Sequence, residues 1–152
     1  YRTPHGQLGL IKECMEDTRQ KDNNLFVCVN TNTNPDQRYA CINAVSSWSH
    51  IYHRLEYSNY IRTMHNHRFV ASPRGNGVDC HRTWEALYLG CIPIVERSVP
   101  MEYFADLPIL FIDNWNEVTP EFLENQWGEM QNGVYNLDML WMPYWKNLIH
   151  NS

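Results

Sequence analysis

Residues 72–95, SPRGNGVDCHRTWEALYLGCIPIV, combine glycines, arginines and a helix start in a spacing that suits anion binding. Gly75 and Gly77 can take positive φ and let a ligand approach the backbone closely. The free amides in the first turn of a helix that follows this loop carry partial positive charge, which favours phosphate. Arg74 and Arg82 add charge-assisted hydrogen bonds to phosphate oxygens. The segment therefore predicts a phosphate site between a loop and a helix N-terminus.

Glu85 extends this pattern from a phosphate to a nucleotide. It follows Arg82 by one helical turn, so both side chains can face the same crevice. A carboxylate that accepts hydrogen bonds from two vicinal hydroxyls is a usual way to hold a ribose. The combination predicts a nucleoside diphosphate. A plain turn stays open as the alternative, with Asp79 as the N-cap and Arg82 paired with Glu85 on the helix surface.

The elements that must position these residues follow from an alternation of short apolar runs and helix-forming segments. We expect strands at residues 25–30, 68–72, 92–95 and 109–112, and helices at 36–47, 57–64, 79–89, 120–130 and 137–149, with 8–17 an ambiguous further helix. Gly90 is expected to end the 79–89 helix as a left-handed cap. Strands that are apolar on both faces and alternate with helices indicate a parallel sheet covered on both sides. We therefore expect one α/β domain over residues 1–152, a Rossmann-like parallel sheet flanked by helices.

In such a sheet, ligands bind beyond the carboxyl ends of the strands. The loops expected at that edge are residues 31–35, 73–78, 96–100 and 113–116. Arg38 lies just inside the helix that follows the first strand, which makes it a second candidate phosphate contact. A solvated helix charge is the alternative interpretation of Arg38.

Residues 69–95 resemble the C-terminal half of exostosin-like glycosyltransferases and, more distantly, the donor domain of fucosyltransferases. The shared pattern is a strand that ends near Ser-Pro, a Gly-rich loop, then Arg, Glu and Ala, and finally Gly-x-x-Pro-Val/Ile; residues 103–115 (YFADLPILFIDNW) continue the likeness. The resemblance implies the two-domain GT-B fold, in which this half binds the sugar nucleotide and an N-terminal half binds the acceptor. By position it implies that Arg82 contacts the diphosphate and Glu85 the nucleoside or sugar.

The predicted function is that of a glycosyltransferase donor domain. We expect it to bind a nucleoside-diphosphate sugar, with a UDP-sugar favoured over a GDP-sugar, for transfer to a glycan or other hydroxyl acceptor. The expected contacts are Arg38, Ser72, Arg74, Gly75, Asn76, Gly77, Asp79, Arg82 and Glu85. No catalytic residue and no cofactor are assigned. Because the sequence contains no Asp-x-Asp, we expect donor binding without a metal ion.

Two further interpretations concern what else the chain binds. Too few residues precede the first strand for an acceptor domain, so we expect an N-terminal domain or a partner subunit to supply it, and poor transfer by this chain alone. A non-catalytic α/β module that binds a nucleotide, a phosphorylated ligand or a protein is the alternative. A zinc set of His65, His67, Cys80 and His81 is disfavoured by its irregular spacing.

The composition limits the partners and the cellular compartment that the sequence suggests. The net charge of -5 argues against broad nucleic-acid or anionic-membrane binding, and no apolar run reaches membrane-spanning length. The five cysteines contain no CxxC pair, and no N-x-S/T acceptor occurs. Both features favour a reducing, cytoplasmic compartment. Cys28, Cys41 and Cys91 lie in apolar surroundings and are expected to be small buried side chains.

Overall fold

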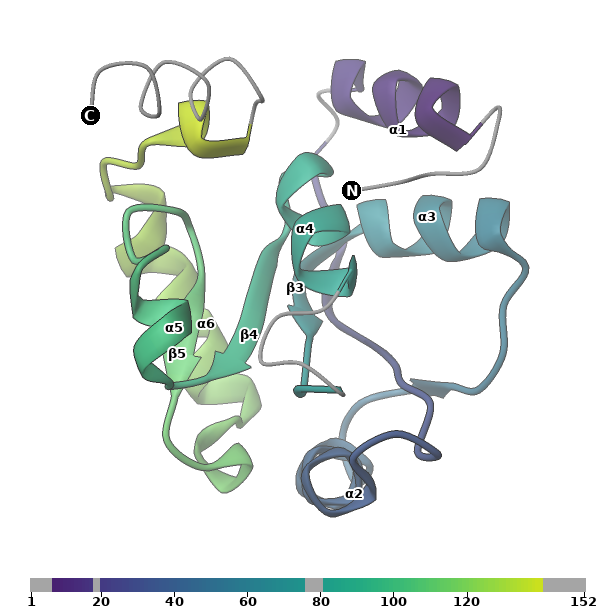
Figure 1. The fold of residues 1–152 in the computed structure, drawn as a ribbon, viewed down its shortest axis with the longest axis vertical. Helices are drawn as coiled ribbons and strands as arrows, with labels where there is room; N and C mark the ends of the chain where they lie inside the picture. Colours follow the sequence, from purple (N-terminus) through teal and green to yellow (C-terminus); the bar gives the residue numbers. More distant parts are fainter. Residues whose placement is uncertain (1–6, 18–19, 76–80, 141–152) are drawn as a thin grey trace.

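Five short segments pair as parallel strands in the computed structural model, which describes residues 7–17, 20–75 and 81–140. They are β1 (Asn23–Cys28), β2 (Ile51–Tyr52), β3 (His67–Ala71), β4 (Ile92–Glu96) and β5 (Leu110–Ile112), in the spatial order β2-β1-β3-β4-β5. The register places Phe26 beside Val70 and Val70 beside Pro93. The arrowheads of β3 and β4 point toward the lower side of Figure 1, which is the carboxyl edge of the sheet. The expected α/β, Rossmann-like fold is confirmed.

Helices cover both faces of this sheet (Figure 1). One face packs against α1 (Gln7–Glu16), α3 (Tyr57–His65) and α4 (His81–Tyr88). The other packs against α2 (Pro35–Val45), η1 (Trp115–Glu117) and α6 (Pro120–Gln131). The short α5 (Val99–Glu102) and η2 (Leu137–Leu140) join β4 and α4 in a third apolar cluster.

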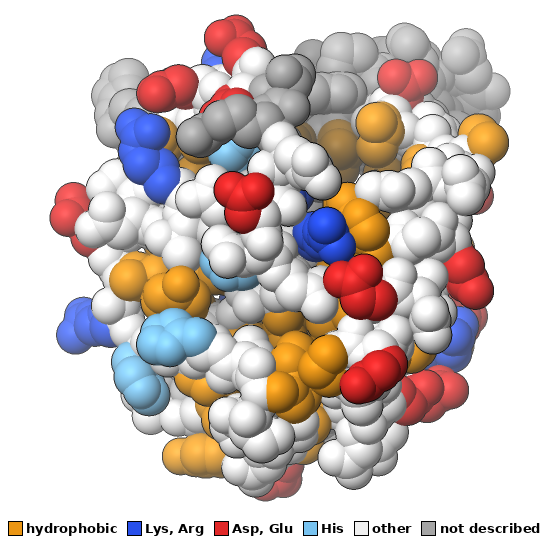
Figure 2. Space-filling view, turned by 180° about the vertical axis from the view of Figure 1, so that it is seen from behind, with side chains coloured by type: hydrophobic (Ala, Val, Ile, Leu, Met, Phe, Trp, Pro, Cys, Tyr) orange, Lys and Arg blue, Asp and Glu red, His pale blue; other side chains and the backbone are white. Residues whose placement is uncertain are grey.

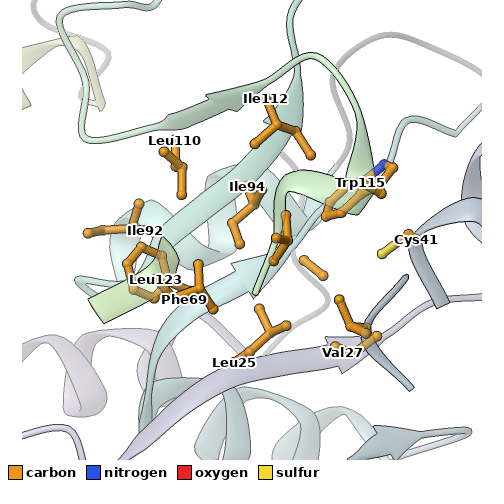
Figure 3. Packing of buried hydrophobic residues seen from close by; sticks show 13 residues of the cluster. Leu25, Val27, Cys41, Phe69, Ile92, Ile94, Leu110, Ile112, Trp115 and Leu123 are labelled. Carbon is orange, nitrogen blue, oxygen red and sulfur yellow. The ribbon is translucent and has the colours of Figure 1, made fainter. Parts of the chain in front are cut away.

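The two-residue period of a strand decides which side chains enter which layer. Leu25 and Val27 of β1 point into the cluster with α2 and α6, whereas Phe26 between them points into the cluster with α1 and α3. Figure 3 shows the first cluster, in which Phe69, Ile94 and other strand residues meet the helices. Burial on both faces is the reason that these strands read as continuous apolar runs.

Several boundaries and elements differ from expectation. The edge strand β2 was not predicted, because two residues are too short to produce a periodic signal. The loop expected at 96–100 instead runs into α5, where Ser98 Oγ accepts a hydrogen bond from the Met101 amide at 3.3 Å. Of the helix expected at 137–149, the described part is the 3-10 turn η2, and residues 141–149 lie outside the description. The start expected at residue 79 for α4 also lies outside it.

Gly90 ends α4 as predicted, with φ of 72°. The Cys91 amide donates to the Ala86 carbonyl at 2.8 Å, and the Gly90 amide donates to the Leu87 carbonyl at 3.2 Å. This pair of bonds is the Schellman arrangement. It fixes the amino-edge end of α4.

The surface carries charges of both signs. On the face in Figure 2, acidic and basic side chains of the described residues are interspersed, and hydrophobic side chains are most frequent in its lower half. Within residues 7–17, 20–75 and 81–140, no helix has the length and apolarity needed to cross a membrane.

Candidate functional site

The loops that follow β1 and β3 meet at the carboxyl edge of the sheet. The chain goes from β1 outward to β2 on one side and then to β3 on the other, so the strand order reverses between β1 and β3. Such a switch point is where open α/β sheets bind ligands. The Asn34 side-chain amide, from the first loop, donates to the Gly75 carbonyl of the second at 3.5 Å. Four of the predicted residues (Arg38, Ser72, Arg74 and Gly75) belong to this junction.

Arg38 ties the two loops together. Its side chain is only 6% exposed. Its Nη1 donates to the Asn30 carbonyl after β1, and its Nε donates to the Arg74 carbonyl after β3 at 3.4 Å. The alternative of a solvated helix charge is therefore wrong. A direct contact between Arg38 and phosphate stays a prediction.

Gly75 makes room for this arginine. A methyl group on its Cα would lie 2.7 Å from Nη2 of Arg38, which is too close for any real contact. Among the described glycines, only Gly90 has a positive φ. The positive φ expected for Gly75 is thus wrong, and Arg38 explains the need for a glycine through lack of space. Close approach of a ligand to the Gly75 backbone stays a prediction.

Ser72 joins the end of β3 to α4. It is buried, its Oγ lies 2.8 Å from Thr83 Oγ1, and its amide donates to the Ile94 carbonyl at 3.0 Å. This hydroxyl pair sets the position of the first turn of α4 relative to the strand. A contact of Ser72 with a ligand stays a prediction.

Glu96, at the end of β4, is a residue that the sequence analysis did not select. Its Oε2 accepts a hydrogen bond from the Arg74 amide at 3.3 Å, and its Oε1 accepts one from Trp115 Nε1 at 2.9 Å. The backbone of Arg74 is therefore held at its N–H by Glu96 and at its C=O by Arg38, while its side chain is exposed. An acidic residue directly after an apolar strand, in a loop expected at this edge, was the available signal.

Arg82 extends toward the end of β1. Burial and, to a smaller extent, the Glu96 carboxylate raise the pKa of the Cys41 thiol to about 12, and the Arg82 guanidinium opposes this rise. Burial also raises the pKa of Cys28, again against the charge of Arg82. Arg82 therefore lies close to the switch point. Cys41 and Cys91 are buried as predicted, whereas Cys28 is partly exposed.

Glu85 faces α3. It is 4% exposed, its Oε2 accepts a hydrogen bond from the Tyr57 hydroxyl at 2.9 Å, and its Oε1 accepts one from the Tyr60 hydroxyl at 3.3 Å. The alternative of an exposed pair with Arg82 is wrong, because Glu85 is buried. Neither tyrosine was selected from the sequence, since nothing local connects them with Glu85.

The three described residues of the disfavoured zinc set, His65, His67 and His81, do not form one cluster. His65 and His67 lie at the amino end of β3, where His67 Nδ1 is 2.7 Å from the Thr63 carbonyl, whereas His81 begins α4 at the carboxyl edge. Among the described residues, no group of three or more His, Cys, Asp or Glu side chains could hold a metal ion. Four of the residues selected from the sequence lie outside the description, namely Asn76, Gly77, Asp79 and Cys80.

No curated protein matches the chain. Residues 16–140 match the family model described as the RXYLT1 C-terminal domain, which is related to xylosyltransferases and to exostosin-like glycosyltransferases. The match includes every strand and every described residue of the β1/β3 edge. The more distant likeness to fucosyltransferases stays a prediction. Because the matched residues make up more than half of the chain, the chain belongs to the RXYLT1 C-terminal domain family, a glycosyltransferase-related family.

Proposed function

We propose that this chain is the donor-binding domain of a glycosyltransferase. The ligand is a nucleoside-diphosphate sugar, with UDP favoured over GDP, and it binds at the β1/β3 carboxyl edge. One observation carries the proposal: buried Arg38 joins the two switch-point loops directly beside the exposed Arg74. Two loops held together in this way form a fixed base on which an anion can bind.

The charges at this edge suit a diphosphate. Arg74 and Arg82 supply guanidinium groups that neutralise phosphate oxygens, and the N-terminal end of α4 adds its partial positive charge. Two cations of this kind replace the metal ion that other glycosyltransferases use, so binding is metal-independent. Glu85 lies on the nucleoside or sugar side. Asn76, Gly77 and Asp79 remain proposed contacts on the segment between the described parts.

The acceptor is a glycan or another hydroxyl compound, and a second domain or a partner subunit binds it. The description of the family as a C-terminal domain supports this GT-B arrangement. Because the family is xylosyltransferase-related, UDP-xylose is the first donor to test. A reducing, cytoplasmic compartment is also proposed, and the free thiols of Cys14, Cys28, Cys41 and Cys91 support it.

Calorimetry with UDP, GDP and uridine tests the binding proposal. Arg82→Ala removes charge-assisted hydrogen bonds of roughly 1.5–3 kcal/mol each, so UDP affinity should fall about ten- to a hundredfold while uridine affinity changes little. Arg62→Ala is the matched control, because Arg62 is an exposed arginine on α3 that pairs with Glu13 at 3.5 Å. Its UDP affinity should equal that of the wild type.

Four outcomes contradict parts of this proposal. If the wild type binds neither diphosphate, the proposed donor site is refuted. Unchanged affinity in Arg82→Ala refutes it as well. Binding that disappears with EDTA removes metal independence. Binding of donors that the full-length protein neither hydrolyses nor transfers favours the non-catalytic alternative.

A further inference from the structure

Glu96 places a carboxylate at the carboxyl edge of the sheet, beside the loop proposed to bind phosphate. It is the last residue of β4, and the parallel strands all end at this edge. Its Oε2 accepts a hydrogen bond from the Arg74 amide at 3.3 Å. Burial is the main cause of the raised pKa of Cys41, and the charges of Glu96 and Arg82 also act on this thiol, in opposite directions. The carboxylate therefore lies near the two arginines proposed to bind the diphosphate.

The partners of Glu96 are neutral groups. Its Oε1 accepts a hydrogen bond from Trp115 Nε1 at 2.9 Å, so each oxygen accepts from one uncharged N–H group. By contrast, Asp113 after β5 and Glu102 in α5 both pair with Arg97, at 3.3 and 3.7 Å. Within the described parts of the chain, Glu96 forms no such ion pair. Its negative charge is thus held in place without being neutralised by a partner.

A negative charge beside an anion site repels ligands in proportion to their own charge. The terminal phosphate of a free nucleoside diphosphate carries roughly −1.5 to −2 charge at neutral pH. In a nucleoside-diphosphate sugar the same phosphate carries only about one negative charge, because the sugar is attached to one of its oxygens. A carboxylate at this place therefore repels the free diphosphate more strongly than the sugar donor.

We propose that Glu96 is a specificity-determining residue of the donor site, whose charge lowers the affinity for a free nucleoside diphosphate relative to the nucleoside-diphosphate sugar. This inference rests on the proposed function, because it requires a diphosphate at the loop that contains Arg74. Arg74 and Arg82 attract both ligands and attract the free diphosphate more, and Glu96 offsets that difference. Since transfer of the sugar leaves the free diphosphate, the offset favours exchange of this product for a new donor.

Calorimetry with UDP and UDP-xylose tests this inference. Glu96→Gln keeps the shape of the side chain and removes its charge. The affinity for UDP should rise about three- to tenfold, and the affinity for UDP-xylose should rise less. The ratio of the two affinities should thus shift toward UDP by about threefold. If the wild type binds only GDP, GDP and a GDP-sugar are used as the pair.

Two further variants separate charge from position. Glu96→Asp keeps the charge and shortens the reach to the two N–H groups, so the ratio should stay close to that of the wild type. Asp113→Asn is the matched control, because it removes one charge at the end of the neighbouring strand β5, from a side chain that pairs with Arg97. It should not change the ratio. Melting curves identify variants that do not fold, and Glu96→Ser then replaces Glu96→Gln, since this position is partly exposed and water can reach the freed N–H groups.

The possible outcomes separate this inference from the proposed function. If the wild type binds UDP and the ratio is unchanged in the folded Glu96→Gln variant, the inference is overturned and the donor site stands. It is also overturned if Glu96→Gln and Glu96→Asp weaken both ligands equally, because Glu96 then only positions the loop. A loss of UDP-xylose affinity alone would assign Glu96 to the sugar instead, and an equal shift in Asp113→Asn would assign the effect to the surface charge in general. If the wild type binds neither UDP nor GDP, the proposed function fails and this inference fails with it.

Discussion

At each of the two edges of the sheet, a basic side chain donates hydrogen bonds to backbone carbonyls, but the two side chains connect different parts of the chain. At the carboxyl edge, Arg38 donates to the carbonyls of Asn30 and Arg74. At the amino edge, the Lys21 Nζ donates to the carbonyl of His65 and, at 3.1 Å, to that of Leu89. Arg38 thus joins two loops, whereas Lys21 joins the ends of two helices.

Helix polarity explains the difference. Helix α4 returns against the strands, so its negative end lies at the amino edge and its positive end at the carboxyl edge, and the last turn of α3 also lies at the amino edge (Figure 1). The positive charge of Lys21, a residue of the chain itself, interacts favourably with these negative helix ends. At the carboxyl edge, Arg74 and Arg82 add positive charge to an end that is already positive. That edge therefore suits an anion from solution.

A pocket at the amino edge reinforces this contrast. It lies between α1 and α3, and its lining is mostly charged: Glu13, Cys14, Glu16, Asp17, Arg62, His65 and Asn66. Three carboxylates against one arginine repel phosphate. The charges of this amino-edge pocket oppose a diphosphate, which supports placing the proposed donor site at the carboxyl edge.

The largest effect is expected from Arg38→Met, which should destabilise the two loops at the carboxyl edge. Loss of a buried cation that binds two carbonyls should lower the free energy of unfolding by about 2–4 kcal/mol. Because the two loops also separate, UDP affinity should fall more than about tenfold. Urea unfolding and calorimetry measure the two effects. Reduced stability with unchanged affinity would show that Arg38 supports only the fold.

Lys21→Met is the counterpart at the amino edge. It removes hydrogen bonds from a cation to two carbonyls that end helices, so stability should fall by about 1.5–3 kcal/mol. UDP affinity should not change, because the helix N-termini at the carboxyl edge stay in place. A fall in affinity as large as that of Arg38→Met would erase the distinction between the edges.

Gly75→Ala sharpens the comparison without removing a charge. The added methyl group would meet Arg38 Nη2 at 2.7 Å, so the guanidinium must move or the loop must shift. Overpacking of this kind costs about 1–3 kcal/mol, and we expect the lower half of that range because a side-chain end can yield. UDP affinity should fall together with the free energy of unfolding. Gly90→Ala is the amino-edge control, since the nearest atom there, Lys21 Cε, is 4.0 Å away and backbone strain alone acts.

The smallest effect concerns His67 at the amino edge. Burial lowers its pKa from the ordinary value of 6.5, Lys21 lowers it further, and the hydrogen bond to the Thr63 carbonyl opposes the shift. Well above pH 6.5 the residue is neutral in both states and contributes no pH dependence. As the pH falls below 6.5, the unfolded chain binds a proton that folded His67 resists, so stability decreases.

His67→Gln should remove this part of the pH dependence, whereas His50→Gln, at an exposed position, should retain it. Unfolding in urea between pH 7.5 and about 5 gives the comparison. A wild-type stability that rises as the pH falls through this window would contradict the sign. UDP binding at a fixed pH should be the same in both variants.

The sequence by itself determined the layers of this protein. Apolar runs too short for helices and buried on both faces identified four of the strands, and Gly90 marked the end of α4 through its backbone preference. The alternation of these runs with helices placed residues 72–75 at the carboxyl edge, because parallel strands all end there. These are local or periodic properties of the chain. The two-residue strand β2 had no such signal and was missed.

Only the tertiary structure decided which side chains hold the site. Arg38 and Arg74 are 36 residues apart, Arg74 and Glu96 are 22 apart, and Tyr57 and Glu85 are 28 apart. Charge and position in the sequence made Arg38 and Glu85 candidate ligand contacts. Their partners are two carbonyls and two phenols, and all of these except the nearby Asn30 carbonyl reach them only after the strands have paired. Because a buried charge has lost its hydrogen bonds to water, it must form hydrogen bonds with groups of the protein that the fold brings close to it.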